Sequence, residues 1–187
     1  MVEYLEDSHT YLVDGLIVPS VTRIVGWKLN EDWSKVPQKI LQAKATYGTE
    51  VHELIQAYEN GMTMKELSLM HIDPNQKVAV KQYAEIKKMA MFEVKNMEQI
   101  VYNDKVAGRY DILTTNDELI DIKTTYRLNT EYLEWQLGLY YYLMGIKRQY
   151  GYVVWLPKQT KPKFKEITVH SHKECEELIE AFLNSDR

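Results

Sequence analysis

The sequence predicts an α/β fold, in which a mixed sheet built in the order αβββαβ is flanked by helices and preceded by a β-hairpin and a helical segment. Two observations favour this fold. Apolar residues recur at helical spacing over residues 75–92 and 131–147. Between and after these two segments, apolar and polar residues alternate as in strands that bury one face. Helices and strands that alternate in this way are typical of a layered α/β domain.

The N-terminal residues predict a β-hairpin. Residues 9–18 alternate around Asp14-Gly15, a dipeptide that favours a two-residue hairpin turn. Ser20 follows, and serine is a preferred helix N-cap. A small hairpin that leads into helices is therefore expected.

The helical segment is expected to contain one long and one short helix. Apolar spacing over residues 33–60 predicts the long helix, with a break near Tyr47-Gly48 as an open alternative and Gly61 as its stop. A short helix is expected over residues 64–70.

The core strands follow the helix over residues 75–92. One strand is expected within residues 94–102, and two more surround Asp111 and Asp121, with turn residues at 114–117 between them. An odd number of loop residues would place Asp111 directly opposite Asp121, whereas an even number would pair Asp111 with Ile122. We expect the odd loop.

The C-terminal part adds a strand over residues 150–156, another over 163–169 and a helix over 173–183. No internal repeat, low-complexity tract or long linker interrupts the sequence, which indicates a single domain over residues 1–187. Its hairpin and first helices occupy residues 1–74, and its core occupies the remainder.

Composition limits the classes of protein. With 187 residues, of which 45% are hydrophobic and 27% charged, the chain can bury the core of one globular domain. A net charge of −4 argues against coating nucleic acid by bulk electrostatics, although a local basic groove stays compatible with it.

The single cysteine, Cys175, excludes an internal disulfide and any four-cysteine zinc or iron–sulfur site. No apolar run is long enough for a membrane span, and the first residues lack the pattern of a secretory signal. We therefore expect an intracellular protein without a membrane partner.

Two carboxylates and an ammonium are expected on the two neighbouring strands. Asp121 and Lys123 lie two residues apart, so they share one strand face, while Ile120 and Ile122 point to the other. Facing carboxylates at Asp111 and Asp121 repel unless a cation lies between them, and hard divalent ions prefer oxygen donors. The alternative is a solvated charged strand face, since Asp-x-Lys tripeptides are common.

Five motifs follow one another along the chain. They are Gly48-Thr49-Glu50-Val51-His52, Glu98, Gly108-Arg109-Tyr110-Asp111, Asp121-Ile122-Lys123 and Gln136-Leu137-Gly138-Leu139-Tyr140. In this order they resemble the motifs of the PD-(D/E)xK nuclease superfamily, and specifically its RecB-like exonuclease branch, which includes small phage and bacterial exonucleases related to lambda exonuclease. The resemblance implies a restriction-endonuclease-like core. Some members of the superfamily bind an iron–sulfur cluster through cysteines, which this chain lacks.

The resemblance implies a site for one or two Mg²⁺ or Mn²⁺ ions. Asp111, Asp121 and the backbone carbonyl of Ile122 would supply oxygen ligands, and His52 would add a nitrogen, which suits Mn²⁺ better than Mg²⁺. Glu98 would reach an ion through water. The alternative for His52 is a packed ring whose nitrogens are satisfied by backbone groups.

The resemblance also implies catalytic and DNA-contacting residues. Lys123 would orient the attacking water or stabilise the transition state. Gln136, Tyr140 and Tyr132 recur one turn apart on a helix face, where they could bind phosphate or stack on an unpaired end. Thr124 could donate to phosphate, although a β-branched residue also suits the end of a strand.

The expected function is that of a metal-dependent exonuclease that hydrolyses DNA from a free end, in phage or bacterial recombination, repair or DNA turnover. It would act in the cytoplasm, with a recombination or single-strand annealing protein as a further partner. Two alternatives stay open, a structure-specific endonuclease of the same fold and a non-catalytic module that binds DNA ends.

Overall fold

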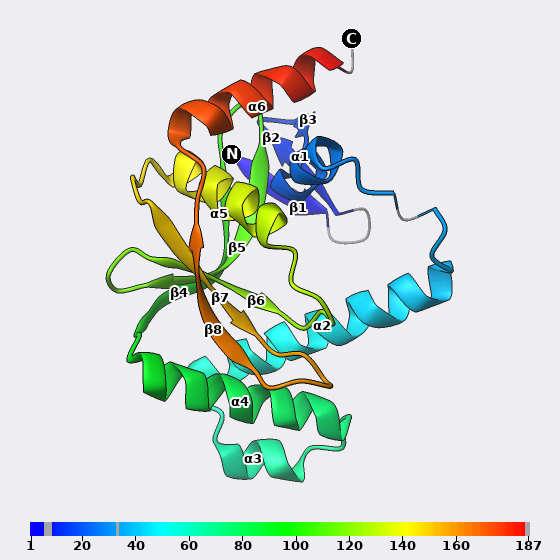
Figure 1. Cartoon of the computed structure of the whole chain (residues 1–187), viewed down its shortest axis with the longest axis vertical. Helices are drawn as coiled ribbons and strands as arrows, with labels where there is room; N and C mark the ends of the chain where they lie inside the picture. The colour runs from blue at the N-terminus through cyan, green and yellow to red at the C-terminus, as the bar shows by residue number, and fades with distance from the viewer. Residues whose placement is uncertain (6–8, 33, 186–187) are drawn as a thin grey trace.

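A five-stranded mixed sheet and a three-stranded antiparallel sheet organise the chain, with helices around them (Figure 1). The computed structural model describes residues 1–5, 9–32 and 34–185. The strands are β1 Val2–Leu5, β2 Thr10–Val13, β3 Leu16–Val18, β4 Val94–Tyr102, β5 Ala107–Thr114, β6 Leu119–Lys123, β7 Tyr150–Trp155 and β8 Lys163–Thr168. The helices are α1 Val21–Lys28, α2 Gln38–Glu59, α3 Met64–Leu69, α4 Pro74–Ala90, α5 Thr130–Met144 and α6 His172–Ser185.

The larger sheet has the order β4-β5-β6-β7-β8. Neighbouring strands in this sheet are antiparallel, except that β6 and β7 are parallel. The crossover connection that a parallel pair needs is made by α5. The elements from α4 to β7 follow the order αβββαβ, and helices flank a mixed sheet. These parts of the predicted fold are confirmed.

The turn between β5 and β6 has the odd number of residues that the sequence predicts. Thr114 donates its N–H to the carbonyl of Glu118 at 2.9 Å, which leaves residues 115–117 as the loop. Asp117 closes the loop with φ 56°, the left-handed conformation that three-residue hairpin loops require.

The smaller sheet, β1-β2-β3, contains the predicted hairpin and a third strand, β1, that the sequence did not indicate. Asp14 and Gly15 have φ values of 51° and 82°, as the two central residues of a type I′ turn need. Ala107 of β5 donates its N–H to the carbonyl of Pro19 at 3.1 Å. This bond ties the smaller sheet to the end of the larger one.

Three helices, α3, α4 and α6, begin and end within two residues of their predicted bounds, whereas α5 ends at Met144, three residues before the predicted end. Ser20 caps α1 by accepting a hydrogen bond from the backbone N–H of Arg23 at 3.0 Å. A break in α2 near Tyr47-Gly48 is wrong, because the helix continues through both residues. One glycine costs a helix about 1 kcal/mol, which the packing of its apolar face outweighs. Residue 33, where the sequence predicts the start of this helix, lies outside the described residues, but residues 34–37 are not helical and α2 begins only at Gln38, so the predicted start is wrong.

The larger sheet is the middle layer of the molecule. Ile120, Ile122 and Val154 pack toward α2, α3 and α4, whereas Leu119 and Val153 pack toward α1, α5 and α6. Figure 1 shows these two helical layers below and above the sheet. Asp121 and Lys123 alternate with the isoleucines, so they point toward α5.

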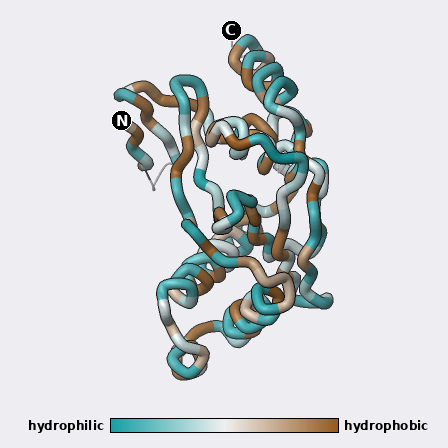
Figure 2. Tube along the Cα trace, turned by 90° about the vertical axis from the view of Figure 1, so that its left-hand side faces the viewer, coloured by the Kyte–Doolittle hydropathy of each residue, from teal (hydrophilic) through white to brown (hydrophobic). Residues whose placement is uncertain are grey.

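Figure 2 shows hydrophobic and hydrophilic residues interspersed along the chain. Among the helices of residues 1–5, 9–32 and 34–185, none combines the length and apolar character that crossing a membrane requires.

Candidate functional site

The β5–β6 register brings the two predicted aspartates together. Ile112 pairs with Ile120, and one further step along this register places Asp111 opposite Asp121, as predicted. The main-chain pairing of β5 with β6 ends at Ile112 and Ile120. Oδ2 of Asp111 accepts a hydrogen bond from the N–H of Ile122 at 2.6 Å, which fixes this carboxylate against β6.

Asp121 and Lys123 form a close ion pair. Nζ of Lys123 donates to Oδ1 of Asp121 at 2.8 Å and lies 2.7 Å from Oδ2. Asp121 is only 3% exposed, and within the described part of the chain its Oδ2 accepts no directed hydrogen bond. Burial raises the pKa of Asp121, opposed by Lys123. Burial lowers the pKa of Lys123, but Asp121 and Asp111 outweigh it, so the net shift is upward and the ammonium is favoured.

His52 meets two carboxylates. Its Nδ1 lies 3.2 Å from Oε1 of Glu98 and 3.7 Å from Oδ1 of Asp111, and its Nε2 lies 3.1 Å from the carbonyl oxygen of Ile122. Burial opposes the charged ring, but Asp111 and Glu98 outweigh burial and raise the pKa of His52 to about 9. The imidazolium therefore offsets the repulsion between the two carboxylates.

These three side chains fit a metal ion. His52, Glu98 and Asp111 each offer one ligand atom, and these atoms lie within 4.8 Å of one another. One imidazole nitrogen and two carboxylate oxygens are donors that Mg²⁺, Mn²⁺ and related ions accept. Glu98 joins the group directly, where the sequence analysis expected it to act through water. Asp121, expected as a further ligand, pairs with Lys123, and its role as a ligand stays a prediction.

Glu98 has a strained backbone. Its φ is 50°, although it lies inside β4, and the residues on either side keep one register with β5, which places Glu98 opposite Asp111. A non-glycine residue in the left-handed region costs about 1–2 kcal/mol and persists where surrounding contacts enforce it. No local pattern in the sequence signals this conformation.

Arg109, to which the sequence analysis assigned no role, holds Glu98 from its other side. Its Nε lies 3.0 Å from Oε2 of Glu98. Its guanidinium carbon is 5.4 Å from the centre of the Tyr4 ring, a cation–π contact that joins β5 to the smaller sheet. This arrangement depends on β1, which the sequence did not predict.

His52, Glu98 and Asp111 line a cavity of about 440 Å³, called the cleft here. It lies where the smaller sheet, the start of α1, the middle of α2, the strands β4 and β5, and α5 meet. Its lining is Tyr4, His9, Tyr11, Ser20, Val21, Thr22, Gly48, Thr49, His52, Glu53, Gln56, Glu98, Gly108, Arg109, Asp111, Gln136 and Tyr140.

Gln136 and Tyr140 line the cleft from α5 but are 6% and 3% exposed. Oε1 of Gln136 accepts a hydrogen bond from Nζ of Lys123 at 3.3 Å. A Cβ at Gly108 would lie 2.7 Å from Cε1 of Tyr140, so the glycine of the Gly-x-x-Asp motif lets α5 approach β5. This placement suits a role in positioning Lys123, and their contact with DNA stays a prediction.

Tyr132 and Thr124 lie beside the same region. Tyr132 is half-buried, and burial raises its pKa to about 12, opposed by the charge of Lys123. Thr124 is half-buried against α2, with Oγ1 3.5 Å from the place of a Cβ on Gly48. The predicted contacts of these two residues with DNA stay predictions.

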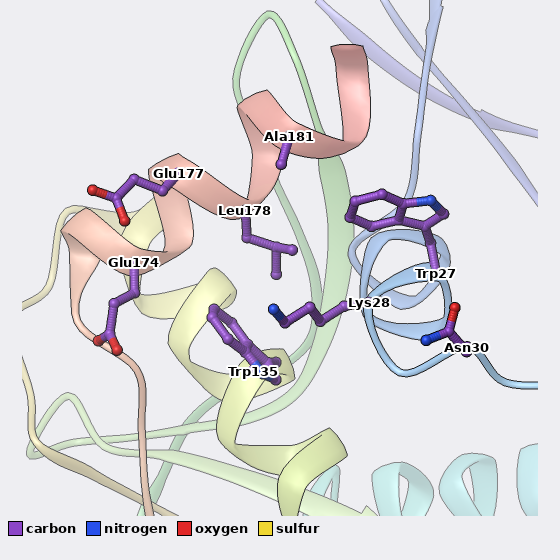
Figure 3. Close-up of a pocket in the computed structure, with 8 residues that line it drawn as sticks. All are labelled: Trp27, Lys28, Asn30, Trp135, Glu174, Glu177, Leu178 and Ala181. Carbon is purple, nitrogen blue, oxygen red and sulfur yellow. The ribbon is translucent and has the colours of Figure 1, made fainter. Parts of the chain in front are cut away.

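A second cavity, of about 450 Å³, lies between α1, α5 and α6 (Figure 3). Lys28 extends across it, and its Nζ is 5.4 Å from the centre of the Trp135 ring. Glu174 and Glu177 stand at its edge, and Glu174 is bonded to Ser171. Among the described residues, none lines both this cavity and the cleft.

Comparison with known proteins leaves the family open. No family model matches the chain. No curated protein matches it. A solved structure titled "Crystal structure of SSO0001" is similar over 89% of this chain and 74% of that chain, with 15% sequence identity and a TM-score of 0.47. A likeness at this level carries no argument about function, which therefore has to be inferred from the geometry of the chain itself.

Proposed function

We propose that this protein is a metal-dependent deoxyribonuclease that hydrolyses phosphodiester bonds from DNA ends, built on a restriction-endonuclease-like core. The observation that carries the proposal is the convergence of two groups, one built from α2, β4 and β5 and the other from β6. His52, Glu98 and Asp111 form the metal-binding group, and the Asp121–Lys123 ion pair lies beside it. The element order from α4 to β7 supports the assignment of the core.

His52, Glu98 and Asp111 would hold the ion. When bound, Mg²⁺ or Mn²⁺ would neutralise charge on phosphate oxygens and lower the pKa of a coordinated water. Because a histidine nitrogen belongs to the donor set, we expect Mn²⁺ to support activity at least as well as Mg²⁺.

Lys123 would stabilise the negative charge that develops on the phosphate, or orient the attacking water. Asp121 and Gln136 accept hydrogen bonds from its Nζ, which holds the ammonium in one place. Because its pKa is raised, Lys123 stays protonated and is a poor general base. The buried Asp121 thus acts on the position and charge of Lys123.

DNA as the substrate, a free end as its site of attack, and a recombination or annealing protein as a partner rest on the motif resemblance. Cleavage assays with linear and circular DNA in Mg²⁺, Mn²⁺ or chelator test the proposal. We expect digestion of linear DNA that chelator abolishes. Cleavage of circular DNA would indicate an endonuclease, and binding without cleavage would indicate an end-binding module.

Two variants and a control assign that activity to the site. Lys123→Ala and Asp111→Ala should each lower the rate by at least about 100-fold, as loss of electrostatic stabilisation does in other enzymes. Lys95→Ala is the control, because Lys95 is exposed and pairs with Asp117 near the β5–β6 turn. Full activity in either site variant would overturn the proposal.

A further inference from the structure

We propose that Arg109 is the phosphate-binding residue of the cleft and holds a phosphate group of the substrate strand beside the metal-binding group. This inference rests on the proposed nuclease function and adds a subsite to it. Arg109 precedes Asp111 by two residues on β5, so both side chains leave the strand in the same direction. A phosphate bound by Arg109 would therefore lie next to Asp111.

The guanidinium of Arg109 is fixed before any ligand binds. Glu98 contacts its Nε at 3.0 Å, and the Tyr4 ring lies 5.4 Å from its central carbon. These contacts come from β4 and β1, on different sides of the arginine. Because the side chain is already ordered, it loses little conformational entropy when it binds an anion.

The charges in the cleft leave this role to Arg109. Among the described residues that line the cleft, Arg109 is the only lysine or arginine; His52 belongs to the metal-binding group, and Glu53, Glu98 and Asp111 are acidic. A phosphate that enters therefore needs a cation of the protein besides any bound ion. The hydroxyl groups of Ser20 and Thr22 are neutral donors in the same lining.

Arg109 also has the right donors. A guanidinium carries five N–H groups in a fork that matches two phosphate oxygens, and the contact with Glu98 is made at Nε. The side chain is 40% exposed, so a ligand in the cleft can reach its terminal nitrogens. The phosphate could be a terminal phosphomonoester or an internal phosphodiester, since both present paired anionic oxygens.

Steady-state cleavage and equilibrium binding of fluorescent oligonucleotides test this role. The oligonucleotides carry a 5′-phosphate, a 3′-phosphate or only hydroxyl ends; cleavage is followed in Mn²⁺, and binding is measured by anisotropy in chelator. Arg109→Ala should raise KM and Kd by about 10–100-fold with a smaller effect on kcat, the range for a lost charge-assisted pair. The KM and Kd of Arg109→Lys should lie between those of wild type and Arg109→Ala.

Substrate ends separate the two sources of phosphate. If Arg109→Ala weakens binding only of the 5′-phosphorylated or only of the 3′-phosphorylated oligonucleotide, the subsite takes a terminal phosphate. If it weakens binding of all three oligonucleotides equally, the subsite takes an internal phosphodiester. Arg148→Ala is the matched control, because Arg148 bonds the carbonyl of Asn116 in the β5–β6 turn and does not line the cleft. We expect its KM within twofold of wild type.

Two results would overturn the role of Arg109. One is a folded Arg109→Ala protein with wild-type KM and Kd. The other is a fall in kcat alone, which would mean that Arg109 acts only by holding Glu98. If wild-type protein binds oligonucleotides without cleaving them, the nuclease proposal fails, and the binding comparison still decides the phosphate subsite. If it neither binds nor cleaves them, both proposals fail.

Discussion

Replacement of Gly108 by alanine tests the contact that joins β5 to α5. The new Cβ would lie 2.7 Å from Cε1 of Tyr140 and 3.0 Å from Cγ2 of Val21, distances that carbon atoms do not reach without a shift. Tyr140 and Val21 are 3% and 0% exposed, so neither side chain can turn away into solvent. The strand and the helix would have to move apart.

The expected cost follows from overpacking. Extra methyl groups in a filled core destabilise proteins by about 1–3 kcal/mol. For a chain of 187 residues the entropy of unfolding is about 0.4 kcal/mol/K, so Gly108→Ala should lower Tm by about 3–8 °C. Activity should fall as well, because Gln136, one turn before Tyr140, would shift from Lys123.

Calorimetry with two further variants separates this clash from a general effect of alanine. Gly26→Ala is the control, since its Cβ would meet Oε2 of Glu31 at an ordinary 3.5 Å inside α1, where alanine stabilises a helix by up to about 1 kcal/mol. Tyr140→Leu removes Cε1, so the double variant Gly108→Ala/Tyr140→Leu should lose less than the sum of the two changes. A Gly108→Ala protein that melts within 1 °C of wild type, or strict additivity, would refute the reasoning.

Three further outcomes follow from the site. In chelator, Lys123→Met should lower the free energy of unfolding measured in urea by about 3 kcal/mol, because it leaves the buried Asp121 uncompensated; adding Asp121→Asn should recover most of this loss, and additive losses would contradict the pairing. Glu98→Gly should be about 1 kcal/mol more stable than Glu98→Ala, since only glycine accepts φ 50° without strain; equal stabilities would argue against that conformation. The pKa of His52 is raised to about 9 in metal-free protein, so its protonation adds stability that is fully present below pH about 6.5 and is lost as pH rises through 9. The difference in free energy of unfolding between wild type and His52→Gln should therefore shrink from pH about 6.5 to about 9. A constant difference would count against the charged ring.

The β5–β6 hairpin could be predicted because its determinants are local. The alternation around Asp111 and Asp121 sets the faces of the strands, and the number of residues in the turn sets their register. Both are read from neighbouring positions in the chain. The same holds for the Asp14-Gly15 turn, whose positive φ values follow from residue type.

Features that depend on contacts between distant segments could not be predicted from the sequence. The short strand β1 is stabilised by pairing with β2, and Arg109 meets Tyr4 only because of that pairing. Glu98, with its left-handed backbone, is contacted through its side chain by His52 of α2 and Arg109 of β5, both distant in the sequence. Tyr47-Gly48 shows the opposite error, since a local signal for a break was overridden by the packing of α2.

Thermal melting in Mn²⁺ tests the central claim most directly, namely that His52, Glu98 and Asp111 hold a divalent ion in the folded protein. At 100 times its Kd, an ion that binds only the folded state adds about 2.7 kcal/mol, which is about 7 °C for a chain of this length. We expect such a rise for wild type and none for Asp111→Asn. An unchanged Tm in wild type, or the same rise in Asp111→Asn, would contradict the metal site and with it the hydrolytic function.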